Sequence, residues 1–75
     1  MCFLVAKNID EPGSIALQMQ GGKDIIAFKK MLDSEFGHAK LQLITISRPS
    51  AYGEYAPYSF VDSKEKFKTE IKKII

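Results

Sequence analysis

Few side chains in this sequence have the types and spacing that catalysis needs. The single thiol, Cys2, and the single imidazole, His38, could act as nucleophile and base only within hydrogen-bond reach, roughly 3 Å. The expected topology places them at opposite ends of the molecule. One lone histidine is also a poor metal site. The sequence therefore predicts no metal and no cofactor, and it leans away from an enzyme; a Cys2 thiolate near a helix N-terminus is the catalytic alternative.

A group of five residues is a better candidate, because its chemistry suits an anion. Gly22 and Lys23 open an expected helix, where free backbone N–H groups and the positive dipole end favour negative charge. Arg48 can fork onto a carboxylate or phosphate. Tyr52 and Tyr55 offer rings and hydroxyls, as recognition surfaces do. The sequence predicts a small anionic ligand, or a carboxylate of a protein partner, at these residues.

Each of these features also has a plain structural reading. The double glycine lacks the spacing of a P-loop or of a dinucleotide fingerprint, so it can be an ordinary turn. Arg48 can pair with Glu54, and the tyrosines can fold back to close the end of a small core. Both readings stay open at this point.

Hydrophobic spacing predicts the elements that position these residues. Strands are expected at 2–7, which is continuously apolar, at 14–20, which alternates, and at 40–48; a short edge strand is possible at 58–61. A helix is expected at 23–36, because Ile25, Phe28 and Leu32 recur at three- and four-residue spacing. A second helix follows Asp62, with Asp62 as its N-cap and Glu65 completing a capping box.

The order ββαβα predicts a two-layer α+β fold in a single domain of residues 1–75. A right-handed crossover makes the strands at 14–20 and 40–48 parallel to each other. The most apolar strand, 2–7, is expected between them, which gives a three-stranded mixed sheet of order 2-1-3 with both helices on one face. This order brings the double glycine, Arg48 and the tyrosines to one rim of the sheet. The other face keeps apolar residues, and we expect it or an edge strand to form a homodimer.

Charge and composition limit the partners. The net charge of +2 comes entirely from residues 62–75, where five lysines face three acidic residues. Lys64, Lys68 and Lys72 share a helix face and could meet nucleic acid phosphates, but the footprint is weak for that role. No apolar run approaches the length of about 18 residues that a membrane span needs. One cysteine and no secretory signal favour a cytoplasmic protein.

Two stretches carry a resemblance to a known family. They are the opening Met-Cys-Phe-Leu-Val-Ala-Lys and the segment Thr45-Ile-Ser-Arg-Pro-Ser-Ala-Tyr-Gly-Glu-Tyr-Ala-Pro-Tyr58. The chain resembles, over nearly its whole length, a family of very short bacterial proteins of unknown function. This resemblance implies a bacterial cytoplasmic protein and assigns no activity or site residue. We interpret the sequence as a small, self-associating binding module, with nucleic-acid contact through the last helix as the alternative.

Overall fold

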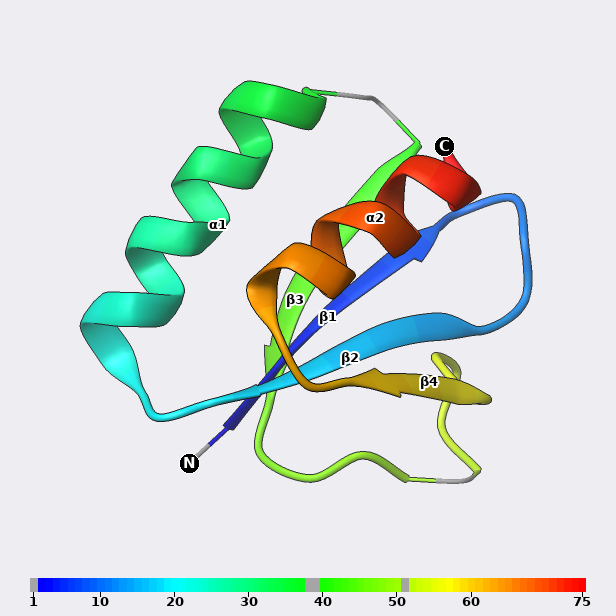
Figure 1. Cartoon of the computed structure of the whole chain (residues 1–75). Helices are drawn as coiled ribbons and strands as arrows, with labels where there is room; N and C mark the ends of the chain where they lie inside the picture. The colour runs from blue at the N-terminus through cyan, green and yellow to red at the C-terminus, as the bar shows by residue number, and fades with distance from the viewer. Residues whose placement is uncertain (1, 38–39, 51) are drawn as a thin grey trace.

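The chain folds into a sheet covered on one side by two helices, as the computed structural model shows (Figure 1). The structure describes residues 2–37, 40–50 and 52–75. Along the chain the elements are β1 (Cys2–Asn8), β2 (Ser14–Met19), α1 (Gly22–Phe36), β3 (Leu41–Ile46), β4 (Tyr58–Val61) and α2 (Lys64–Ile74). The predicted α+β class and the element order are confirmed.

The sheet has four strands in the order β3-β1-β2-β4. β1 pairs antiparallel with both β2 and β3, so β2 and β3 run in the same direction on either side of it. This confirms the predicted order 2-1-3. The possible fourth strand forms as well: β4 pairs parallel to β2 and lies at the edge.

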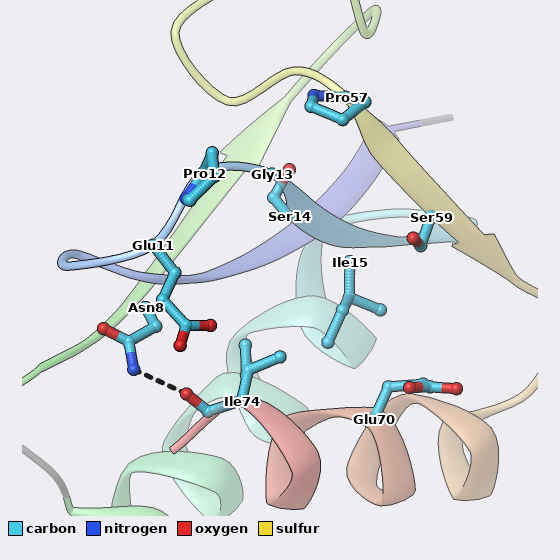
Figure 2. A pocket seen from close by; sticks show the side chains of 10 residues that line it. All are labelled: Asn8, Glu11, Pro12, Gly13, Ser14, Ile15, Pro57, Ser59, Glu70 and Ile74. Atoms are coloured by element: carbon cyan, nitrogen blue, oxygen red, sulfur yellow. Dashed lines mark hydrogen bonds between the residues drawn. The ribbon is translucent and has the colours of Figure 1, made fainter.

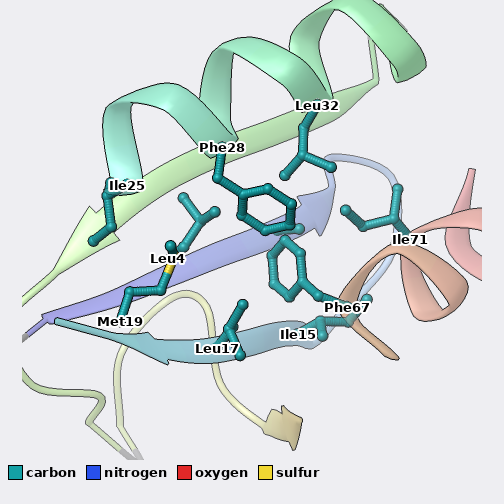
Figure 3. Packing of buried hydrophobic residues seen from close by; sticks show 10 residues of the cluster. Leu4, Ile15, Leu17, Met19, Ile25, Phe28, Leu32, Phe67 and Ile71 are labelled. Atoms are coloured by element: carbon teal, nitrogen blue, oxygen red, sulfur yellow. The ribbon is translucent and has the colours of Figure 1, made fainter. Parts of the chain in front are cut away.

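The core lies between the sheet and the helices (Figure 3). Alternation along the strands turns Leu4, Ala6, Ile15, Leu17 and Met19 toward the helices, and all five are buried. Their partners from α1 and α2 include Phe28 and Phe67, whose ring centroids lie 5.9 Å apart. An ion pair of 3.4 Å between Glu35 and Lys68 joins the two helices at the surface.

The face of the sheet away from the helices is covered in its middle, contrary to the expectation of an open face. Val5 and Ala16 point away from the core cluster, yet both are fully buried. The chain between β3 and β4 runs on that side of the sheet (Figure 3). β3 and β4 run in the same direction, so this segment must return from one rim to the other before β4 can begin.

The start of α2 differs by one residue from the prediction. Ser63, not Asp62, is the N-cap, and its hydroxyl oxygen accepts a hydrogen bond from the Lys66 backbone N–H at 3.1 Å. Asp62 instead forms an i,i+4 ion pair with Lys66 at 3.3 Å. The residue at the third helical position is therefore a lysine, so Glu65 does not complete a capping box.

Candidate functional site

Three of the five predicted site residues share one rim of the sheet. Cys2 pairs with Met19 and Phe3 pairs with Ile46, so β2 and β3 end beside the start of β1. Gly22 and Lys23 follow β2 within four residues, and Arg48 follows β3 by two. Two strands that flank a third lie about 10 Å apart. The grouping of these three residues agrees with the topology, whereas ligand binding by them stays a prediction.

Tyr55 does not join this rim, and its predicted placement there is wrong. The backbone oxygen of Tyr55 accepts a hydrogen bond from the Ser14 hydroxyl, and Ser14 begins β2 at the opposite rim. Tyr52 is 99% exposed and contributes its backbone N–H to a turn, with the Ser50 hydroxyl oxygen as acceptor at 3.2 Å. The return segment carries Tyr55 away from Arg48, whereas the placement of Tyr52 at the rim stays a prediction. The five predicted residues thus do not form one site.

The remaining rim has a mixed electrostatic character. The N-cap of α1 is Gly21, which has no side chain to accept a hydrogen bond, so the first backbone N–H groups of the helix are left for solvent or a ligand. Asp24 in the first turn already supplies negative charge to this helix end, which opposes an anion. Arg48 is exposed, and within the described part of the chain it forms no ion pair with Glu54 or any other acid.

A pocket of about 210 Å³ opens at the opposite rim, between the β1–β2 turn, the start of β4 and the end of α2 (Figure 2). Its polar groups are largely used within the fold. The Asn8 side-chain amide donates to the Ile74 carbonyl, and the Ser14 hydroxyl donates to the Tyr55 carbonyl. Glu70 lies 3.6 Å from Lys73. These bonds tie the turn, the return segment and α2 together, which is a structural role.

An aromatic surface lies at the β4 edge of the sheet, and the sequence interpretation did not identify it. Phe60 is 62% exposed. Its ring lies 5.9 Å from that of Phe3, in a T-shaped arrangement, and 6.0 Å from that of Tyr58. Beside these rings is an apolar hollow of about 340 Å³, which Pro49, Ala56 and Pro57 line together with Tyr58 and Phe60. We call Phe3, Tyr58 and Phe60 the aromatic patch.

One signal in the sequence could have located the aromatic patch. The segment Tyr58-Ser59-Phe60-Val61 alternates, so as a strand it places Tyr58 and Phe60 on one face. Whether that face is the one toward the helices or the one away from them depends on the pairing register with β2, in which Ala16 lies opposite Phe60. Because that pairing joins residues far apart in the chain, the sequence alone did not decide whether Phe60 faces the core or solvent.

The basic residues of α2 are mostly engaged with the protein itself. Lys64 places its ammonium 5.4 Å from the centroid of the Phe28 ring, and Lys68 pairs with Glu35. Of the three lysines predicted to share a face, Lys72 alone has no described partner among the residues that the structure covers. A partner's phosphates would have to displace the other two contacts, which weakens the nucleic-acid interpretation.

The remaining chemical candidates give no site. Cys2 is half-buried and packs against the core, as a small apolar side chain does. His38 lies outside the described residues, so its separation from Cys2 stays a prediction. In the described ranges no three His, Cys, Asp or Glu side chains gather in a group that could hold a metal ion. Neither helix there is long and apolar enough to cross a membrane.

Comparison with known proteins supports the resemblance stated from the sequence. A family model described as "Family of unknown function (DUF6718)" matches residues 1–74. No curated protein matches the chain. The match covers both stretches on which the resemblance was based, and it brings no activity and no assigned residue with it.

Proposed function

Since the chain belongs to this family of unknown function, we propose its role from the geometry: it is a small interaction module that works as a homodimer. The observation that carries the proposal is the exposure of Phe60, 62%, within a strand of the sheet. An exposed phenylalanine bordered by further aromatic and proline side chains is typical of a protein–protein contact rather than of a solvated surface.

The apolar residues around Phe60 support the same proposal. Strand pairing places Ile44, Val5, Ala16 and Phe60 in one row across the face away from the helices. Val5 and Ala16 are buried, whereas Phe60 at the end of the row is not. A second molecule that covers Phe60 would continue the apolar contact, and each Å² of apolar surface so buried is worth about 25 cal/mol.

The setting that we propose is a bacterial cytoplasm. The resemblance to very short bacterial proteins supports the origin. The half-buried Cys2, which forms no disulfide, supports a reducing compartment.

Light scattering at about 100 μM tests self-association, since a dimer with a micromolar Kd is largely assembled there. We expect a dimer mass for the wild type and a monomer mass for Phe60→Ser. Ile26→Ser is the matched control. Ile26 is 57% exposed, so this variant removes a similar apolar surface, but from α1 and not from β4. A monomeric wild type, or equal effects of the two variants, contradicts the proposal.

A second candidate function is anion binding at the rim of Gly22, Lys23 and Arg48. The guanidinium of Arg48, which is exposed and has no ion-pair partner in the described ranges, favours it. With inorganic phosphate as the probe, Arg48→Ala should weaken binding far more than Lys72→Ala, which removes another exposed charge, on α2. If the two variants weaken binding equally, only the overall positive charge of the protein attracts phosphate. If the wild type does not bind phosphate at all, this candidate function is excluded.

A further inference from the structure

We propose that two copies of the chain join through β4 in an antiparallel pairing whose twofold axis passes beside Ser59, which makes one continuous eight-stranded sheet. This inference rests on the proposed homodimer and specifies its contact. It follows from the direction of the backbone groups of β4, from the side chains along its edge and from the comparison with the other edge strand, β3.

The outer edge of β4 has four backbone groups that the fold leaves unpaired. The Ser14 backbone N–H donates to the Pro57 carbonyl at 3.0 Å, so Pro57 directs its carbonyl toward β2. Backbone groups alternate in direction along a strand, so Ser59 and Val61 also face β2, whereas Tyr58 and Phe60 direct their N–H and C=O outward. No described residue bonds to these two donors and two acceptors.

One register satisfies all four groups at once. If Tyr58 of one copy lies opposite Phe60 of the other, each such pair exchanges two N–H···O=C bonds, and the twofold axis generates the second pair. Ser59 then lies opposite Ser59 of the second copy as a non-hydrogen-bonded pair. A strand of only four residues is enough, because its two outward-facing residues are the two that this register uses.

The same register brings the exposed aromatic rings together. Tyr58 and Phe60 have their side chains on one face of the sheet, away from the helices. Opposite residues in an antiparallel pair have their Cβ atoms about 4.5–5.5 Å apart, so each Phe60 ring meets a Tyr58 ring of the second copy. The row of Ile44, Val5, Ala16 and Phe60 then ends on a protein surface and not in water.

The charges that α2 carries beside β4 allow a second copy of the chain to approach. α2 packs over β1, β2 and β4, and beside the β4 edge it presents Lys66 and Glu70 along a surface hollow. A twofold axis normal to the sheet places α2 of the second copy on the same side, in the opposite direction. The strip carries both signs, so it presents no single-sign charge to the second copy.

β3, the other edge strand, is the weaker choice. It is longer, with six residues, and none of them carries a charge. However, no side chain of β3 is among the exposed large apolar residues of the described chain, whereas Phe60 of β4 is. Pairing through β3 would leave the Phe60 ring in water, and pairing through β4 covers it.

Disulfide trapping tests the register. Ser59→Cys is made in a Cys2→Ser background, so that the new thiol is the only one. Directly opposite residues of a non-hydrogen-bonded pair have Cα atoms about 4.5 Å apart, which lies within the range that a disulfide spans. We expect rapid formation of a disulfide-linked dimer under mild oxidation. Ser34→Cys in the same background is the control, since Ser34 is equally a serine but lies exposed on α1, and it should cross-link at least 10-fold more slowly.

Hydrogen exchange on the wild-type chain gives a second measurement that needs no substitution. The amide protons of Tyr58 and Phe60 should exchange slowly at high concentration and at least 10-fold faster after dilution below the Kd. If the wild type is monomeric by light scattering, the homodimer itself fails. If it is dimeric but Ser59→Cys cross-links no faster than Ser34→Cys, or these two amides exchange alike at both concentrations, the β4 register is wrong and the homodimer stands.

Discussion

Tyr55 donates its hydroxyl hydrogen to the Glu54 carboxylate, and this bond raises the pKa of the phenol above its ordinary value of about 10. Partial burial and the negative charge of Glu54 act in the same direction. The predicted role of this hydroxyl was to face an anion at the rim of the sheet. Its partner is instead the neighbouring residue, at the other end of the return segment, because the path of the backbone decides what a side chain meets.

The raised pKa predicts a loss of stability in alkali. The folded state favours the protonated phenol, so the contribution is fully present below pH 10 and is lost as the pH rises through the folded-state pKa. Urea unfolding between pH 8 and about pH 11 should show a smaller alkaline loss for Tyr55→Phe than for the wild type. Tyr52→Phe, at the exposed tyrosine, should behave as the wild type does. The Lys40–Asp10 pair raises the Lys40 pKa and weakens in the same range, so the comparison between variants carries the test.

Gly13 and Gly22 are expected to respond oppositely to alanine. Gly13 has φ of 86°, and a Cβ there would lie 3.3 Å from the Pro57 carbonyl oxygen, so Gly13→Ala should cost about 1–2 kcal/mol. Gly22, at the start of α1, has open space where a Cβ would lie, and Gly22→Ala should stabilise by about 0.4–1 kcal/mol. Urea midpoints of the two variants check this. A neutral Gly13→Ala would show that the turn relaxes without cost.

At the scale of elements, the helices and strands could be predicted where the signal is local. The spacing of Ile25, Phe28 and Leu32 fixed the buried face of α1, and all three are buried. The cap of α2 is a case in which two adjacent residue types compete. Asp62 and Ser63 are both good N-caps, and the register of β4 against β2 decides where the strand ends and the helix begins.

The N-cap assignment predicts unequal effects for the two residues. Ser63→Ala should destabilise the chain by about 1 kcal/mol, because the Lys66 backbone N–H loses its acceptor. Asp62→Ala removes a 3.3 Å ion pair between exposed side chains and should cost no more than about 0.5 kcal/mol. Denaturant unfolding of both variants is the measurement. A larger loss for Asp62→Ala would restore Asp62 as the residue that starts the helix.

At the scale of the whole molecule, chain direction predicted the central part of the fold. A right-handed crossover and a very apolar first strand were enough to place β1 between β2 and β3. The pairing of β4 with β2 at the edge of the sheet was not predicted. Once β4 joins β2 in parallel, the segment after Arg48 must cross from one rim of the sheet to the other, and this crossing separates Tyr55 from Arg48. That pairing leaves no local pattern in the sequence, so the position of Tyr55 was predicted wrongly and the exposure of Phe60 was not predicted.

Self-association predicts that the stability of the whole molecule depends on its concentration. A dimer that only folded chains can form stabilises them by mass action, and 1 kcal/mol shifts the Tm of a domain of this size by about 4–8 °C. Raising the wild type from about 1 μM to about 100 μM should therefore raise its Tm by at least about 4 °C. Phe60→Ser should have the same Tm at both concentrations, whereas Ile26→Ser should keep the shift of the wild type, because Ile26 lies on α1 and away from the β4 edge. A wild-type Tm that stays constant over this range would contradict the homodimer.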